Sequence, residues 1–324
     1  MKYLKKFTRE TDFQTAKRYF EYPTVSYVTS PDEVKYMGEP FWTARYNVTS
    51  TTEPVRVICD TGCSNDQNKE FGLGDNPLRA VYYKGVNVLD QLVKERWYYS
   101  SHSAYYNHLD FTFSETGQQE LIFVFQNAYE INQITFSFLN SLIYVSCSKT
   151  VEYIPMSLCY GSPSLNNFNF TSIVKTVGNM AFKGVKSLNT LSFDKNGNEP
   201  LILGHQAFST CTGITGIVEL PDRLVEMCTS TFHACSNIKE LHIGSKLERL
   251  KLYNPRLATG MTNLEKIVLK TVVPPTLVPA DYNTFTELAN TPKMQGLYVP
   301  AEALNAYKTA DGWRVFADKI FPIE

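Results

Sequence analysis

The sequence predicts a mainly β chain with short helices, in which a small N-terminal β domain precedes a solenoid of about seven turns and a helical C-terminal cap. Three observations predict this class. An apolar pattern recurs along the C-terminal three-fifths of the chain, and each copy ends in strand-like alternation followed by Gly, Pro or Asn. Aromatic residues make up 13% of the chain, which suits strand-rich folds. A chain of 324 residues has room for about two domains.

The recurring pattern begins with Phe, continues with apolar residues three positions apart, and closes with one or two more at strand spacing. It is clearest in three copies: Phe182, Val185, Leu188, Leu191 and Phe193; Phe208, Cys211, Ile214, Ile217 and Leu220; and Phe232, Cys235, Ile238, Leu241 and Ile243. Weaker copies run from Phe136 to Cys147, from Leu158 past Leu165 (one residue too long), from Ala258 to Leu269, and from Phe285 to Val299. One turn cannot bury its own apolar face, whereas stacked turns share a continuous core. An amphipathic helix has similar spacing but lacks the closing alternation.

The repeats, placed in residues 128–324, resemble the BspA-like leucine-rich-repeat family, whose copies carry AF-x-x-C-x-x-L-x-x-L-x-I. The ending LYVPAEALNAYKTADGWRVFADKIFPIE (297–324) is also similar to that family's terminus, with Pro300 opening a helix that carries Leu304 and Tyr307. This resemblance implies a C-terminal cap in which four apolar residues cover the last turn: Trp313, Phe316, Ile320 and Phe321. It also implies a role in recognition or adhesion, in gut Bacteroidales or their phages, without a fixed ligand.

The front of the chain divides into two expected segments. Residues 1–39 are expected to form a helix and an extended anchoring arm, in which four apolar residues alternate around a Ser-Pro-Asp turn: Val25, Tyr27, Val34 and Tyr36. This arm resembles an N-terminal segment of structural proteins of phages that infect Bacteroidales, although it also reads as a plain hairpin. Residues 40–127 are expected to form a small β-sandwich-like domain with strands at 54–59, 79–85, 108–113 and 120–125, the last two joined as a hairpin.

The composition narrows the partners and the compartment. The net charge of −1 argues against nucleic acid as a main partner, because phosphate binding needs a basic surface. No apolar run has the length of a membrane span, and the basic N-terminus lacks the apolar stretch of a signal peptide. The seven cysteines are an odd number in a long chain, which does not suit a disulfide framework. We therefore expect reduced cysteines and assembly in a cytoplasm.

Two groups of residues resemble a catalytic site and a metal site. The run Asp60-Thr61-Gly62 matches the core of an aspartic protease site, but that chemistry needs two carboxylates and this motif occurs once, so a turn is the plainer reading. Four residues offer zinc-ligand atoms, but their spacing is unusual and buried or loop positions explain them as well: Cys59, Cys63, His102 and His108. The sequence therefore predicts no catalytic residue, no metal site and no cofactor.

Two surfaces remain as candidate binding sites. Strand alternation directs one set of repeat residues outward on the sheet face: Thr190, Ser192, Glu240, His242, Lys266, Val268 and Tyr298. The same pattern is equally consistent with an ordinary solvated sheet surface that binds nothing. The second candidate is an aromatic loop at 96–108, with Trp97, Tyr98, Tyr99, Tyr105 and Tyr106. These rings also suit the core of the β domain.

The function predicted first is a non-enzymatic virion protein of a phage, of the tail or head fibre type, located in a particle assembled in the bacterial cytoplasm. Its arm would bind other virion proteins or a second copy, giving a homo-oligomer, and its repeats would serve host attachment through a surface protein or glycan. The alternative is a secreted or surface-attached bacterial adhesin of the same repeat family that binds a host protein or glycan. Neither setting requires membrane insertion.

Overall fold

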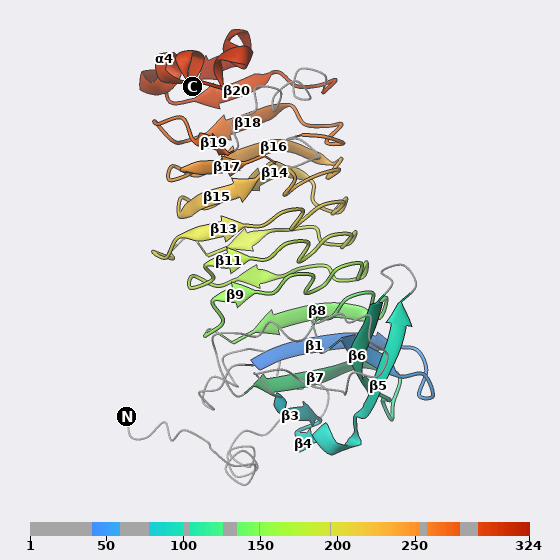
Figure 1. Ribbon diagram of the computed structural model, residues 1–324. Helices are drawn as coiled ribbons and strands as arrows, with labels where there is room; N and C mark the ends of the chain where they lie inside the picture. The colour runs from blue at the N-terminus through green and yellow to red at the C-terminus, as the bar shows by residue number, and fades with distance from the viewer. Residues whose placement is uncertain are drawn as a thin grey trace, which may run out of the picture. The chain divides into compact units, whose positions relative to one another are not determined.

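The computed structural model describes residues 41–58, 78–99, 104–125, 135–148, 150–194, 196–252, 258–278 and 291–324 (Figure 1). The predicted helix and anchoring arm, including Val25, Tyr27, Val34 and Tyr36, lie outside these residues. The chain divides into two compact units, Met1–Glu152 and Tyr153–Glu324.

The first unit contains two antiparallel sheets. A five-stranded sheet has the order β4-β3-β7-β1-β8, and a three-stranded sheet has the order β2-β6-β5. The strands are β1 (Phe41–Val48), β2 (Val55–Ile58), β3 (Leu78–Tyr83), β4 (Val86–Asn87), β5 (Val93–Tyr99), β6 (Ala104–Phe111), β7 (Gly117–Phe125) and β8 (Leu142–Cys147), with a short 3-10 helix η2 (Leu89–Gln91) before β5.

Aromatic rings fill the space between these two sheets. The ring of Tyr83 on β3 lies 5.3 Å from the ring of Phe111 on β6, and 5.4 Å from that of Phe113. Phe113 also contacts Tyr46 of β1 at 5.6 Å, and all four rings are buried. Edge-on ring pairs of this kind add to the stabilisation from burial. The prediction of a small N-terminal β domain is confirmed.

The predicted hairpin between residues 108 and 125 is wrong. β6 pairs with β2 and β5, whereas β7 pairs with β1 and β3, so the two strands belong to different sheets. The reason lies in Phe113, which is buried directly after β6 and packs between the sheets. The chain therefore crosses from one sheet to the other before Gly117, whose φ of +91° begins β7.

The first predicted repeat copy has the expected buried residues but a different pairing. Its apolar positions from Phe136 to Cys147 are buried. However, β8 pairs antiparallel with β1, whereas a solenoid strand pairs parallel with the next turn. The first compact unit includes this copy, since it extends to Glu152.

The second unit is a succession of short parallel strands that form two larger sheets and one two-stranded sheet. We call the six-stranded sheet sheet I, with the order β9-β11-β13-β15-β17-β19, and the five-stranded sheet sheet II, with the order β14-β16-β18-β20-β21. A separate two-stranded sheet pairs β10 with β12. In Figure 1 the labelled strands of sheet I follow one another from β9 to β19. The solenoid prediction is confirmed.

The strands of this unit are short, and their bounds are as follows. Sheet I contains β9 (Tyr153–Ile154), β11 (Thr176–Val177), β13 (Leu201–Leu203), β15 (Leu224–Cys228), β17 (Arg249–Lys251) and β19 (Thr276–Val278). Sheet II contains β14 (Gly216–Glu219), β16 (Ile238–Ile243), β18 (Lys266–Leu269), β20 (Gly296–Val299) and β21 (Ile320–Pro322), and the two-stranded sheet contains β10 (Asn169–Phe170) and β12 (Ser192–Phe193).

A ladder of equivalent residues forms the core of the solenoid. The rings of Phe182 and Phe208 are stacked at 5.5 Å, and those of Phe208 and Phe232 at 5.4 Å, all three fully buried. The thiol of Cys211 donates to the carbonyl oxygen of Phe182 at 3.0 Å, and Cys235 donates to Phe208 at 2.9 Å. Each Cys therefore fills a small apolar position and links its turn to the preceding one.

The copy around Leu158 follows the standard spacing when it starts one residue later. The amide of Cys159 donates to the carbonyl of Ala181 at 2.7 Å, just as the amide of Phe182 donates to Ala207. Cys159 therefore occupies the position that Phe holds in later turns. The ring of Phe168 compensates for the missing one, since it lies 4.9 Å from the ring of Phe182.

The copy that starts at Phe208 contains an extra residue, and the structure places it in a β-bulge. The pairing of β14 with β16 shifts between Gly216 and Ile217, and Gly216 adopts a φ of +71°. The bulge turns Ile217 outward, where it is 56% exposed, and Val218 takes its place in the core. The prediction of Ile217 as a core residue is therefore wrong.

The C-terminal cap consists of η3 (Ala301–Ala303), α4 (Leu304–Thr309), η4 (Arg314–Lys319) and β21. Tyr307 and Trp313 are buried and donate hydrogen bonds to the carbonyl oxygens of Thr271 at 3.1 Å and Pro275 at 2.9 Å. Phe321 differs from its prediction as a covering residue. It lies on the added strand β21, where alternation turns its ring outward, and it is 39% exposed.

The buried thiols predict a loss of stability in alkali. The five described cysteines are buried and free of disulfides, and burial raises the pKa of Cys235 from its ordinary value of 9.0 to about 12. The pKa of Cys235 is higher in the folded protein than in the unfolded chain. The contribution of this thiol to stability is therefore complete below pH 9 and is lost as the pH rises towards 12. We expect the melting temperature to fall above pH 9, and to fall less steeply in Cys235→Ala. Identical slopes for the two proteins would contradict this account.

Candidate functional site

The outward side of sheet II gathers side chains from successive turns. The register places Ile217 opposite Glu240 and Glu240 opposite Lys266, and a second row places Glu219, His242, Val268, Tyr298 and Phe321 side by side. We call this surface the sheet II face and define it by Ile217, Glu219, Glu240, His242, Lys266, Val268, Lys270, Tyr298 and Phe321.

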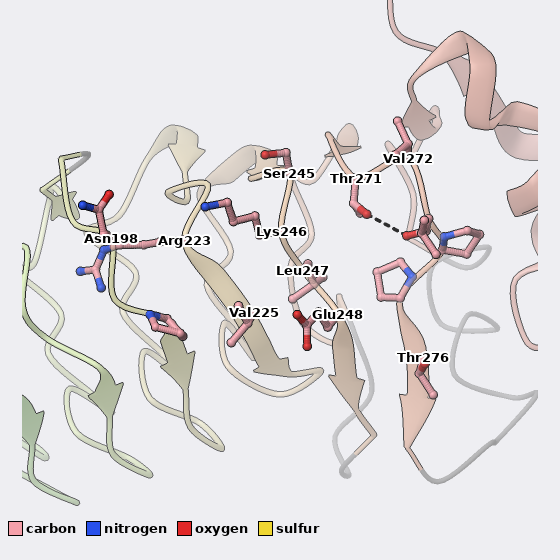
Figure 2. A pocket seen from close by; sticks show the side chains of 14 residues that line it. Asn198, Arg223, Val225, Ser245, Lys246, Leu247, Glu248, Thr271, Val272 and Thr276 are labelled. Carbon is pink, nitrogen blue, oxygen red and sulfur yellow. Dashed lines mark hydrogen bonds between the residues drawn. The ribbon is translucent and has the colours of Figure 1, made fainter.

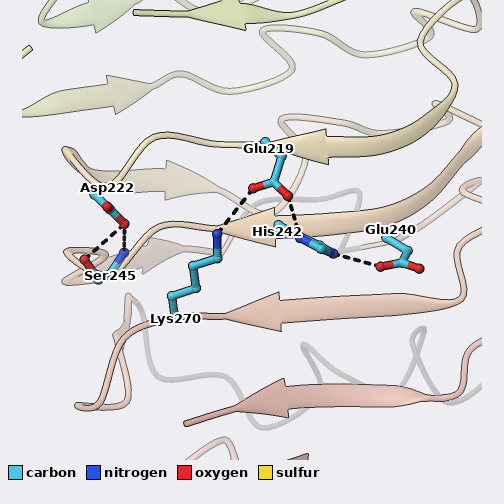
Figure 3. A network of polar contacts seen from close by, with 6 residues as sticks. All are labelled: Glu219, Asp222, Glu240, His242, Ser245 and Lys270. Carbon is cyan, nitrogen blue, oxygen red and sulfur yellow. Dashed lines mark hydrogen bonds and ion pairs between the residues drawn. The ribbon is translucent and has the colours of Figure 1, made fainter. Parts of the chain in front are cut away.

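A polar network occupies the first half of the sheet II face (Figure 3). The Nδ1 atom of His242 lies 2.7 Å from a carboxylate oxygen of Glu219, and its Nε2 atom lies 2.8 Å from one of Glu240. Lys270 reaches the other oxygen of Glu219 at 3.3 Å. An imidazole held at both nitrogens has a fixed ring orientation. The two carboxylates are 44% and 25% exposed, so they offer positioned acceptors to a partner.

Aromatic side chains occupy the other half of this face. The ring of Tyr298 lies 5.7 Å from that of Phe321, and the ammonium group of Lys266 lies 5.3 Å from the centre of the Tyr298 ring. Glycine at position 296 allows this close packing, because a Cβ atom there would stand 2.6 Å from the backbone oxygen of Lys319 and from the Phe321 ring. A rigid apolar surface therefore adjoins the charged network, a combination that is typical of protein contact sites.

The structure brings together most of the predicted face residues. Glu240, His242, Lys266 and Tyr298 lie on neighbouring strands of sheet II. Val268 shares their row but is only 9% exposed, because the side chains on either side cover it. Thr190 and Ser192 are exposed but belong to the turn of β12, which pairs with β10 outside sheet II.

Sequence reasoning missed four members of this face: Ile217, Glu219, Lys270 and Phe321. The extra residue after Ile214 could have indicated Ile217 and Glu219. A bulge at Gly216 exchanges the inward and outward directions of the side chains that follow it. No local pattern indicated that 320–322 would add a strand to sheet II.

The predicted aromatic loop at 96–108 is in large part a hairpin of two strands. β5 and β6 pair antiparallel, with Trp97 opposite Tyr106 and Tyr98 opposite Tyr105, and Tyr99 opposite Ala104. Aromatic residues favour strands, and this preference outweighed the polar residues around them. The side chains of Trp97, Tyr98, Tyr99, Tyr105 and Tyr106 lie outside the described part of the structure, so a contact role for them stays a prediction.

Most of the candidate protease and zinc-site residues lie outside the described ranges, including Cys59, Asp60, Cys63 and His102. His108 is described, and it is a fully buried residue of β6 with its Nδ1 atom 3.9 Å from Asp110. Burial, with a smaller effect of Arg56, lowers the pKa of His108 to about 4. Within the described ranges, no three His, Cys, Asp or Glu side chains gather as metal ligands. The helices there are all too short or too polar to span a bilayer.

A groove of about 610 Å³ lies where the chain passes from sheet II back to sheet I (Figure 2). Its floor includes Val225 and Leu247, and its rim includes Asn198 at one end and Val272 at the other. Arg223 lines the first end and is 3% exposed. The groove is thus a second concave surface on the solenoid, separate from the sheet II face.

These features define the class of the protein: a leucine-rich-repeat solenoid with an open sheet face, of the kind that contacts other molecules over several turns. A family model described as the BspA type leucine rich repeat region matches six copies, in residues 108–200 and 198–274. Since these segments together cover just over half of the chain, the protein belongs to the BspA-type leucine-rich-repeat family.

The chain is also similar to a leucine-rich repeat protein from Bacteroides ovatus whose crystal structure is known. The two are 15% identical with a TM-score of 0.19, and the match covers 48% of this chain and 60% of that one, less than two thirds of its length. No curated protein matches the chain. The repeat family that matches the chain indicates no catalytic activity.

Proposed function

We propose that this chain is a non-enzymatic recognition protein that binds a protein partner through the sheet II face. One observation carries the proposal: a positioned charged network adjoins exposed aromatic rings on a single sheet surface. Ile217 and Phe321 are 56% and 39% exposed, so this face offers apolar surface to a partner. A partner that fits would place basic or hydroxyl donors at Glu219 and Glu240, and an apolar side chain beside Tyr298.

We propose a bacterial cell surface as the setting, with the adhesin role that the resemblance to this family implies. Membership of the repeat family supports this setting more than the virion, because the segment that resembles phage structural proteins, residues 25–36, lies outside the described structure. Host attachment by a phage particle stays a prediction. In either setting the same face would meet a foreign surface.

The test compares the binding of the fluorescently labelled full chain to intact mucosal epithelial cells and to intact Bacteroidales cells. The variant Ile217→Asp/Tyr298→Ala is expected to bind roughly thirtyfold more weakly, because truncating an aromatic hot spot costs about 2 kcal/mol and a tenfold change corresponds to about 1.4 kcal/mol. Protease treatment of the cells should abolish binding, and mild periodate oxidation of glycans should not. Binding to epithelial cells supports the adhesin, and binding only to bacteria supports the virion.

Sheet I supplies a matched control. Tyr153 and Val278 lie on that sheet and are 42% and 39% exposed, so Tyr153→Ala/Val278→Asp removes a similar aromatic and aliphatic pair. This control should bind as the wild type does. Equal binding by the sheet II variant would refute the assigned face, and binding that resists protease but is lost on oxidation would refute a protein partner.

A further inference from the structure

The groove in Figure 2 results from unequal connection lengths. The segments that link β12, β14, β16 and β18 to the next strand of sheet I are 194–200, 220–223, 244–248 and 270–275. The first and last are longer than the two between them. The longer connections therefore form two walls, and the shorter ones form the floor that carries Val225 and Leu247.

The later wall is a firm apolar ridge. Val272 and Val273 stand at its crest, 51% and 69% exposed, and are followed by Pro274 and Pro275. The cap fixes this segment from behind, because Tyr307 and Trp313 donate hydrogen bonds to its first and last carbonyl groups, those of Thr271 and Pro275. The hydroxyl of Thr271 also donates to the carbonyl oxygen of Val273 at 2.7 Å. Two adjacent exposed valines on a fixed segment form a preorganised contact surface.

Two opposite charges lie on the floor next to this ridge. Lys246 and Glu248 flank Leu247, both are exposed, and both line the groove. Neither forms an ion pair within 4.0 Å with another described residue. The hydrogen bonds that Ser245 donates lower the pKa of Asp222, and the charges of Lys270 and Lys246 lower it further from a longer range. The side chains of Lys246 and Glu248 are thus available to charges outside this molecule.

We propose that a second copy of this chain docks on the groove about a two-fold axis that passes through the groove at Leu247. A ridge beside a groove is self-complementary under such an axis, because each copy's ridge enters the other's groove. Val273 of each copy then packs over Val225 of its counterpart, on the far side of the axis. Near the axis, Lys246 of one copy meets Glu248 of the other, and this pairing occurs twice.

The charge pair makes the proposal testable in the full chain by sedimentation velocity over a wide range of concentrations. The wild type is expected to form a dimer as the concentration rises. Lys246→Glu alone and Glu248→Lys alone are each expected to remain monomeric, because like charges then meet across the axis. Val273→Asp should also be monomeric, because it would bury an unpaired charge.

Two further experiments test the two-fold arrangement itself. The double variant Lys246→Glu/Glu248→Lys should dimerise again. A mixture of the two single variants should also dimerise, since each then faces its opposite charge. A wild type that is monomeric at every concentration would overturn the proposal, as would a wild-type dimer that survives both single reversals or is not restored by mixing. Unchanged circular dichroism spectra would establish that each variant is folded.

Discussion

Replacing Phe208 with alanine is expected to lower the free energy of unfolding by about 3–5 kcal/mol. Phe208 is the middle ring of the ladder, stacked at 5.5 Å on Phe182 and at 5.4 Å on Phe232. It is fully buried, and its carbonyl oxygen accepts the thiol hydrogen bond of Cys235. Its truncation leaves a cavity between two turns that are held apart by their own hydrogen bonds.

The measurement is urea unfolding followed by circular dichroism, with Phe208→Leu and Ile217→Ala beside Phe208→Ala. Phe208→Leu should retain part of the lost stability, because it refills much of the volume. Ile217→Ala should change little, since that side chain is 56% exposed after the bulge. Equal stabilities for Phe208→Ala and the wild type would contradict the assigned repeat register. Phe232→Ala should behave as Phe208→Ala does.

The second large effect is expected for Arg223→Ala, at about 3 kcal/mol or more. The guanidinium of Arg223 is almost fully buried and donates to three carbonyl oxygens, those of Val174 at 2.6 Å, Glu199 at 3.2 Å and Thr171 at 3.2 Å. These carbonyls belong to two preceding connections, so a single side chain joins three turns. Each buried acceptor that loses its donor costs about 1–3 kcal/mol.

Arg249→Ala provides the comparison for this loss. Arg249 forms an ion pair with Glu226 at 3.1 Å, but its side chain is 53% exposed, and such a pair contributes about 1 kcal/mol at most. Arg223→Lys should resemble Arg223→Ala, because an ammonium group cannot span three separate carbonyls. If Arg223→Ala and Arg249→Ala melt at the same temperature, the proposed link between three turns is incorrect.

The solenoid was predictable because its signal repeats. Any one copy fits a helix or a strand, but Phe182, Phe208 and Phe232 recur at similar intervals with the same companions, and only stacking buries all of them. An apolar pair also precedes Phe208, Leu201 with Leu203, and it lies in strand β13 of sheet I. The buried positions of a repeat can be predicted from its own sequence, without knowing which strand it pairs with.

Features that depend on one residue or on distant pairing were not predictable. The bulge at Gly216 needs only one extra residue, yet it exchanges Ile217 with Val218 and sets the side of Glu219. Crossing between sheets at Phe113 cannot be distinguished from a hairpin without knowing where β1 lies. The network at His242 joins residues 219, 240, 242 and 270, and strand register alone brings them together.

The central claim, recognition through the sheet II face, is tested most directly by lysine footprinting of the full chain while it is bound to the cells that retain it. Lys270 on the sheet II face and Lys251 on sheet I are 45% and 40% exposed, so they should react similarly with an amine-modifying reagent in the free protein. On binding, protection of Lys266 and Lys270 with unchanged labelling of Lys251 is the predicted result. Protection of Lys251 with continued labelling of Lys270 would contradict the claim.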